Sequence, residues 1–130
     1  MTTPYTLKQL TDVEDVAVEF GISEVQEARF AKDDLDAEDT GVSLHCVKAG
    51  KRQAFGHKHD AAEEVYVVLS GAGRVKLDDA IVDLGRLDAI RVAPGVMRAF
   101  EAGPTNDLEL LAVGPRHDGD GEIVQGWWAD

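Results

Sequence analysis

The chain has 130 residues, a length that suits one domain with one buried core and needs no disulfide or structural metal to fold. Its 25 acidic and 13 basic residues give a formal net charge of −12, which argues against nucleic acid or an anionic membrane as a partner, because both would repel it. Cys46 is the only cysteine, and the N-terminal sequence MTTPYTLKQL lacks the apolar core of a signal peptide. We therefore expect a protein of the reducing cytoplasm.

The N-terminal part of the chain predicts a short helix followed by a strand. Apolar side chains recur at intervals of three or four between Leu7 and Phe20, which is the period of an amphipathic helix. A looser alternation over Val25 to Ala31 predicts a first strand. The acidic run over residues 33–39 is interpreted as a solvated loop, because it lacks the Gly and terminal Glu spacing of an EF-hand calcium loop.

From Gly41 onward the pattern is that of short strands separated by Gly, Pro or Asp turns. The predicted strands are Val42 to Lys48, Gln53 to His57, Glu64 to Leu69, Arg74 to Leu77, Ala80 to Leu84, Asp88 to Val92, Arg98 to Ala102 and Leu108 to Val113. Strands of this length and number favour an all-β sandwich or barrel, and a jelly roll would also dispose of exposed edges. We expect one domain over residues 1–130, with a barrel core at 41–113, an N-terminal extension at 1–40 and a C-terminal tail at 114–130.

The tail ends with both tryptophans of the protein, Trp127 and Trp128. Adjacent tryptophans are too apolar to remain in solvent, so we expect them to pack against the barrel wall or against a second subunit.

Two histidines alternate in the predicted strand that begins at Gln53. Alternate side chains of a strand share a face, so His57 and His59 would project together with Cα atoms about 7 Å apart. Glu64 stands where the next strand begins, and Fe(II), Mn(II), Ni(II) and Zn(II) all accept two neutral imidazoles plus one carboxylate. These three residues are the predicted metal ligands.

The stretch from Gly50 to Gly71 resembles the first motif of the cupin superfamily: a glycine, HxH, a glutamate three or four residues later, and a glycine after six more. The second cupin motif, a glycine, then PxG, then a histidine as fourth ligand, is similar to the stretch from Gly85, in which Pro94-Gly95 fits the turn. Arg98 occupies the position where the family places that histidine. The resemblance implies a small single-domain cupin with a jelly-roll barrel, or double-stranded β-helix, a divalent ion such as Mn, Fe, Ni, Co or Zn, and a homodimer.

Arg98 cannot be a ligand because arginine is always charged in proteins. A guanidinium about 4 Å from an ion costs up to roughly 4 kcal/mol per unit of ion charge at an effective dielectric near 20. Two outcomes are open. Arg98 forms a bidentate pair with Glu64 and the barrel is free of metal, or it swings aside and offers its guanidinium to an anionic ligand beside the ion.

Strand parity predicts the rest of the pocket. If His57 and His59 face inward, so do Gln53 and Phe55 on the same strand; if Glu64 does, so does Tyr66; and if Arg98 does, so does Phe100. His45 on the preceding strand and Arg98 itself are further ligand-binding candidates. Such a cavity is mostly apolar with a few placed polar groups, which suits a small organic ligand.

Three functions follow from these patterns. The first is a cupin that binds a divalent ion and a small, anionic organic molecule. The second is a metal-dependent oxygenase or isomerase acting on a small organic acid, with Tyr66 or His45 as proton donor. The third is a metal-free binding or sensing protein in which Arg98 replaces the fourth ligand.

Overall fold

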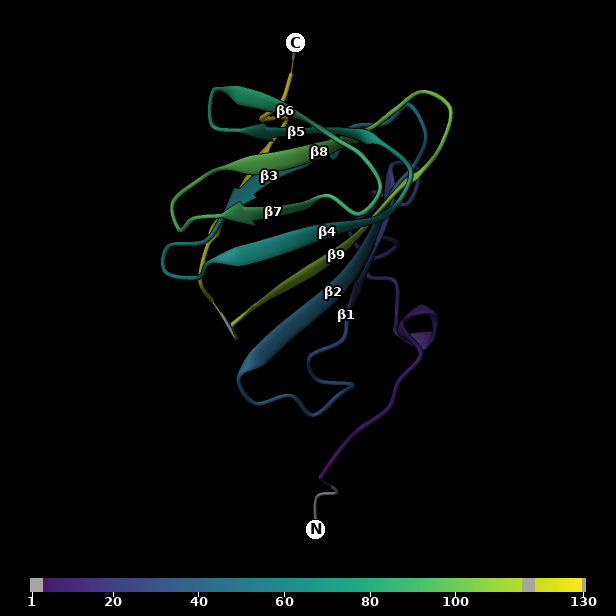
Figure 1. Ribbon diagram of the computed structural model, residues 1–130, viewed down its shortest axis with the longest axis vertical. Coiled ribbons are helices and arrows are strands. Elements are labelled where there is room, and N and C mark those ends of the chain that lie inside the picture. Colours follow the sequence, from purple (N-terminus) through teal and green to yellow (C-terminus); the bar gives the residue numbers. More distant parts are fainter. Residues whose placement is uncertain (1–3, 116–118, 130) are drawn as a thin grey trace.

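The computed structural model describes residues 4–115 and 119–129, and these residues form two antiparallel five-stranded sheets (Figure 1). One sheet has the strand order β1-β2-β9-β4-β7 and the other has the order β10-β3-β8-β5-β6. The strands are β1 (Gln26–Phe30), β2 (Thr40–Val47), β3 (Phe55–Lys58), β4 (Glu64–Ser70), β5 (Gly73–Leu77), β6 (Ala80–Leu84), β7 (Ala89–Val92), β8 (Arg98–Ala102), β9 (Leu108–Pro115) and β10 (Glu122–Gln125). This is the all-β jelly roll that the strand spacing predicts.

The predicted strands coincide with β1 to β9 to within a few residues, but β10 was missed. All four residues of β10 are exposed, so this strand carries no alternation of buried and exposed positions that a sequence pattern could reveal. It forms through backbone pairing with β3, in which Ile123 lies opposite His57. The tail therefore adds an edge strand to the sheet that carries the histidines.

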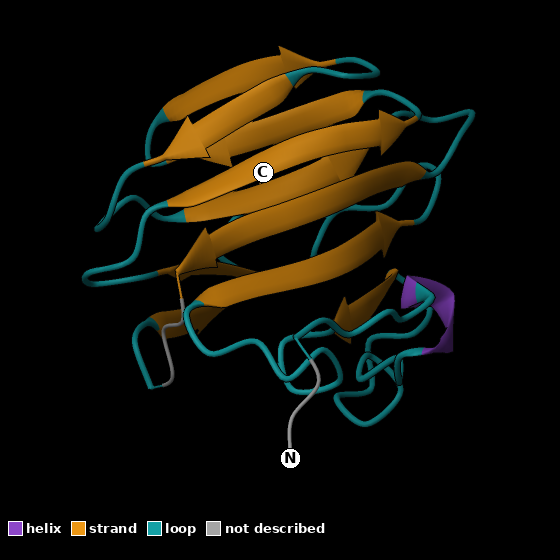
Figure 2. Ribbon diagram, turned by 60° about the horizontal axis from the view of Figure 1, so that its bottom comes forward, coloured by secondary structure: helices purple, strands orange, loops and turns teal. Residues whose placement is uncertain are grey.

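The predicted helix over residues 7–20 is wrong. One 3₁₀ turn, η1 (Leu10–Asp12), forms there, and it lies to one side of the strands (Figure 2). The carboxylate of Asp15 accepts hydrogen bonds from the backbone amides of Ala17 and Ala28, so the segment is tied to β1 and no continuous helix forms. Among the described residues, no helix is long and apolar enough to cross a membrane.

The core lies between the two sheets and follows the alternation along the strands. Its buried members are Val47, Tyr66, Val68, Val75, Leu84, Val92, Phe100, Ala102, Leu108, Leu110 and Ala112. Gly71 closes β4 at a φ of 80°, and a Cβ there would lie 2.0 Å from the carbonyl oxygen of Asp107. Only glycine fits that turn, and β4, which begins at Glu64, ends directly before it.

Residues 119–129, here called the C-terminal strap, are clamped onto the second sheet through the tryptophans. Trp128 is buried, and the guanidinium of Arg52 lies 4.2 Å from its ring centroid while donating a hydrogen bond to its carbonyl oxygen. Trp127 covers Gly56, where a Cβ would lie 2.6 Å from the indole. The expected packing of the tryptophans against the barrel wall is confirmed.

Glu101 connects the two arginines that flank Trp128. Its Oε1 accepts hydrogen bonds from Arg74 and its Oε2 accepts one from Arg52. Burial opposes ionisation of this carboxyl, but the hydrogen bonds from Arg74 and Arg52 outweigh burial and hold the pKa of Glu101 below its usual value of 4.5. The carboxylate therefore stabilises the folded state above pH 4.5 and loses that contribution as the pH falls.

We predict that Glu101→Gln lowers the free energy of unfolding at neutral pH by about 1 kcal/mol, after allowance for solvent screening. The deficit should shrink as the pH is lowered below about 4, because wild type then loses the same interaction. Urea denaturation across this pH range measures both effects. Glu63→Gln, which alters an exposed ion pair with Arg91, is the control and should cost less. A loss of stability that is independent of pH would show that ionisation of Glu101 is not the source of the stabilisation.

Candidate metal and ligand site

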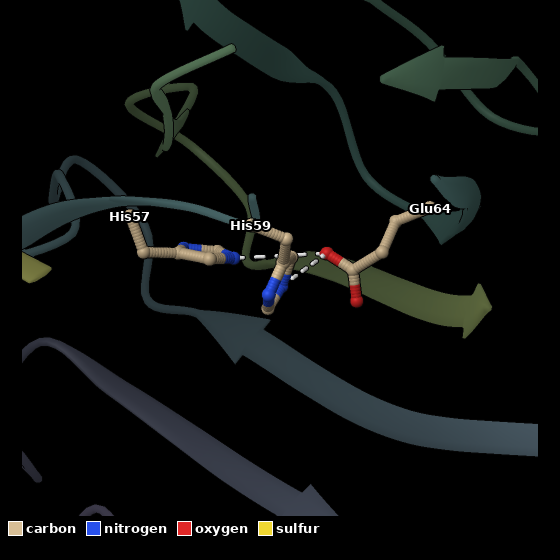
Figure 3. A group of neighbouring side chains, drawn as sticks. All are labelled: His57, His59 and Glu64. Atoms are coloured by element: carbon tan, nitrogen blue, oxygen red, sulfur yellow. Dashed lines mark ion pairs between the residues drawn. The ribbon is translucent and has the colours of Figure 1, made fainter. Parts of the chain in front are cut away.

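The fold brings His57, His59 and Glu64, here called the metal trio, to one place. His57 lies in β3, His59 follows the end of that strand, and Glu64 opens β4 in the other sheet. The Nε2 atoms of His57 and His59 lie 3.7 and 3.2 Å from Oε1 of Glu64, and both rings point at this oxygen (Figure 3). The alternation of the histidines therefore places both side chains on the same side as the carboxylate, as the sequence predicts.

The metal trio fits a divalent ion. One donor atom from each residue lies within 4.8 Å of the others. Metal–ligand bonds of about 2.1 Å in tetrahedral or octahedral geometry separate donor atoms by about 3.0 to 3.4 Å, so only small side-chain adjustments would be needed. Two imidazoles and one carboxylate are also the donor types that first-row transition metals accept.

The backbone of the C-terminal strap orients His59. Its Nδ1 lies 2.7 Å from the carbonyl oxygen of Asp120, and because a carbonyl only accepts, Nδ1 must be the donor. In the neutral ring the lone pair is then on Nε2, the atom that faces Glu64, and only the protonated ring donates from Nε2 to that carboxylate. Such an outer contact fixes the tautomer of a metal-binding histidine.

The side chain of Asp120 holds the loop between β3 and β4. Its carboxylate accepts hydrogen bonds from the backbone amides of Asp60, Ala61 and Ala62 at 2.6 to 3.2 Å. This loop joins the two histidines to Glu64. Asp120 thus sets both the ring orientation of His59 and the path of the chain that delivers the carboxylate.

Arg98 is fully buried and contacts the site from β8. Its Nη2 donates to Oε1 of Glu64 at 3.0 Å, its Nε donates to the hydroxyl of Tyr66, and its Nη1 donates to the carbonyl oxygen of Val96. The bidentate pair, one of the two outcomes left open by the sequence, does not form, because a single nitrogen of Arg98 contacts the carboxylate. Nor does Arg98 swing aside, because its other nitrogens are engaged by neighbours on the protein.

Hydrogen bonds and burial oppose each other within this cluster. Burial disfavours the Glu64 carboxylate, but the nearby ring nitrogens of His57 and His59 and the hydrogen bond from Tyr66 outweigh it and hold the pKa of Glu64 well below its usual range. Burial lowers the pKa of His57, whereas the hydrogen bond with Glu64 raises the pKa of His59. Burial raises the pKa of Tyr66, whose hydroxyl donates a hydrogen bond to Oε1 of Glu64 at 2.7 Å. The carboxylate is thus ionised and available as a metal ligand at neutral pH.

A cavity of about 780 Å³ adjoins the metal trio. The predicted ligand-binding residues Gln53, Phe55, Tyr66, His45 and Phe100 all line it, although Oε1 of Gln53 also accepts a hydrogen bond from the backbone amide of Phe100. Arg98 is not among the described residues that line the cavity, so its direct contact with a ligand stays a prediction.

Several residues of the cavity and its surroundings were missed from the sequence. Gln26 and Ser43 are buried polar residues on its wall. Gln26 alternates with Ala28 on β1 and Ser43 alternates with His45 on β2, so strand alternation could have placed both on the inner face. Asp120 lies 61 positions from His59, and no local pattern connects such distant residues.

The comparisons with known proteins agree with this architecture. Residues 43–114, more than half of the chain, match the family model described as the cupin domain. The chain belongs to the cupin family. A search of curated protein sequences gave no significant match to this cupin.

Solved structures similar to this cupin show the same fold. A cupin protein from Bacteroides fragilis is 22% identical, with a TM-score of 0.69 over 99% of this chain and 91% of that chain. The polyketide cyclase RemF from Streptomyces resistomycificus is 19% identical, with a TM-score of 0.74 over 100% of this chain and 89% of that chain. An oxalate decarboxylase variant from Bacillus subtilis is 19% identical, with a TM-score of 0.74 over 91% of this chain and 31% of that chain.

We predict that Asp120→Ala loosens the loop between β3 and β4. Without the carboxylate, the amides of Asp60, Ala61 and Ala62 lose their acceptor, so their hydrogen–deuterium exchange should accelerate by at least about tenfold, which corresponds to one hydrogen bond of about 1.4 kcal/mol. Asp60→Ala is the matched control and should leave exchange at Ala61 and Ala62 unchanged. Equal exchange in wild type and Asp120→Ala would show that the carboxylate does not hold the loop.

Proposed function

We propose that this cupin binds a divalent transition-metal ion through the metal trio and holds a small, anionic organic molecule beside it in the cavity. The observation that carries the proposal is the convergence of His57, His59 and Glu64 on one point next to a cavity of about 780 Å³. Mn, Fe, Co, Ni and Zn all fit this donor set. When bound, such an ion would supply Lewis acidity toward an oxygen of the organic molecule.

The charges of the site support an anionic ligand. A dication added to the Glu64 carboxylate and the Arg98 guanidinium would leave this buried cluster with a net positive charge. An unbalanced charge away from water is unfavourable, so an anion next to the ion would be stabilised. Arg98 could thus contribute to anion binding through its charge without touching the ligand.

Arg98 also supports the alternative of a metal-free binding cupin. Its contact with Oε1 of Glu64 competes with an ion for that oxygen. The repulsion between guanidinium and ion, up to roughly 4 kcal/mol per unit of ion charge, corresponds to as much as about three orders of magnitude in affinity for each unit of that charge. The two functions therefore differ in one measurable quantity, the metal affinity of the wild-type protein.

Catalysis on a small organic acid, by an oxygenase or isomerase reaction, is a further hypothesis. Solved relatives include proteins named oxalate decarboxylase and polyketide cyclase, but identities of 19% support the fold and not the reaction. Tyr66 lies near both His57 and Glu64, so it is the better placed of the two candidate proton donors.

We predict that untagged wild-type protein binds one divalent ion per chain and that His57→Ala loses it. Elemental analysis after purification, followed by titration calorimetry with MnCl₂ and ZnCl₂ on chelator-treated protein, measures this. Phe55→Ala, which alters the same strand without removing a donor, is the control and should retain the ion. Wild type that binds neither Mn(II) nor Zn(II) would favour the metal-free function.

We further predict that the charge of Arg98 weakens metal binding. Arg98→Met should raise the affinity for Mn(II) by about tenfold or more, because it removes the repulsion, and Arg98→His should raise it further by adding a fourth donor. Arg91→Met on β7, an outward-facing arginine paired with Glu63, is the control and should bind like wild type. Thermal denaturation confirms that each variant is folded. Unchanged affinity in folded Arg98→Met would show that the guanidinium does not oppose the ion.

A further inference from the structure

The cavity has a second polar region, formed by Gln26, Ser43 and His45 and here called the distal polar group. All three residues line the cavity wall on β1 and β2. Ser43 Oγ and His45 Nε2 lie 2.8 Å apart and hydrogen-bond to each other. Within the part of the chain that the structure describes, Oε1 of Gln26 and Nδ1 of His45 are buried without a hydrogen-bond partner.

Two such atoms on one cavity wall require an explanation. A buried polar atom without a partner costs about 1–3 kcal/mol, and folded proteins contain few of them. Gln26 is only 2% exposed, so bulk water does not provide its partner. A strand position next to Ala28 would accept an apolar residue at lower cost. Both residues line the cavity while these two atoms are covered by protein, so a small rotation of each side chain would bring them to a partner that enters the cavity.

Strand registers separate the distal polar group from the strand that bears Glu64, although the charges of His57 and Glu64 still act on the pKa of His45. Ser43 lies level with Tyr66 across β9, and His45 lies level with Val68, farther from Glu64. Because β9 separates β2 from β4, His45 is two strand spacings, about 10 Å, across the sheet from the strand that bears Glu64. Gln26 on β1 is one strand farther, at about 14 Å.

The cavity wall between the two polar regions is apolar. Leu110 and Ala112 on β9 separate β2 from β4, and Phe55 and Phe100 line the cavity from the opposite sheet. Burial lowers the pKa of His45 to about 4, so its imidazole is neutral at physiological pH. The distal polar group thus offers hydrogen bonds without charge, which suits a neutral polar group and disfavours a second carboxylate.

We propose that the cavity takes an elongated organic acid with its carboxylate at the metal trio, an apolar middle, and a hydroxyl at the far end that bonds to Gln26 and His45. The inference rests on the proposed function for the carboxylate end only. A hydroxyl has one proton, so it donates to the carbonyl oxygen of Gln26 and accepts from Nδ1–H of His45, in the tautomer whose Nε2 accepts a hydrogen bond from Ser43. The volume of about 780 Å³ leaves room for an acid larger than one of two carbons.

Matched acids test the proposal. Hexanoate, octanoate and decanoate are each compared with their ω-hydroxy counterparts by titration calorimetry, on chelator-treated protein and on Mn(II)-loaded protein. At the chain length that spans the cavity, the hydroxyl should improve affinity by roughly three- to tenfold, the worth of one buried hydrogen bond. The dicarboxylate of that length should show no such gain.

Two variants assign the gain to the distal polar group. Gln26→Leu and His45→Phe should each abolish the advantage of the hydroxy acid over the plain acid of the same length, whereas Mn(II) binding should persist because neither residue belongs to the metal trio. Glu27→Gln, the outward-facing neighbour on β1, is the control and should keep the advantage. Without ligand, Gln26→Leu should melt at the same temperature as wild type or higher, because it removes an unsatisfied buried atom. A purely structural glutamine would instead lower the melting temperature.

The outcomes separate this inference from the proposed function. If plain and hydroxy acids bind equally at every length, in both forms of the protein, the distal polar group holds only buried water and the inference fails, whatever the metal result. A different result would be that Mn(II) does not bind, that wild type prefers the hydroxy acid, and that Gln26→Leu loses this preference. The proposed metal function then fails and the distal subsite stands.

Discussion

The site depends on one oxygen atom, Oε1 of Glu64. Tyr66 and Arg98 donate hydrogen bonds to it, and the rings of His57 and His59 are directed at it. These partners come from β3, β4 and β8 and from the turn after β3, so the carboxylate joins strands of both sheets. A carboxylate that is buried and ionised needs such partners, since burial alone would keep it protonated. The same oxygen is the position where an ion and the Arg98 guanidinium compete.

The C-terminal strap gives this arrangement its support. The guanidinium groups of Arg52 and Arg74 contact the Trp128 ring and hold the end of the chain on the second sheet, where β10 also pairs with β3. Asp120 is thereby placed against His59 and the loop that precedes Glu64. The geometry of the metal trio is thus set partly by a segment that contributes no donor to it.

The sequence predicts features that depend on the alternation of side chains within a strand. It misses features that depend on contacts between residues far apart in the chain. The two-residue period of strands places His57 and His59 together, and the turn residues give the strands of the jelly roll in nearly correct positions. The helical period over residues 7–20 misleads because Asp15 bonds to β1 instead, and the contact of Asp120 with His59 joins residues 61 positions apart. The sequence shows that Arg98 stands where a fourth ligand would be. It does not show that one nitrogen of Arg98 contacts Glu64, because Tyr66 and the carbonyl of Val96 bind the other nitrogens.

The central claim is that the metal trio holds an ion despite the neighbouring guanidinium. A crystal structure of wild-type protein grown in excess MnCl₂, with anomalous scattering data that identify manganese, tests this most directly. The account predicts an anomalous peak bonded to Nε2 of His57, Nε2 of His59 and an oxygen of Glu64, with Arg98 no longer on that oxygen. Well-ordered density with no peak there, and with Nη2 of Arg98 still hydrogen-bonded to Oε1, would contradict it.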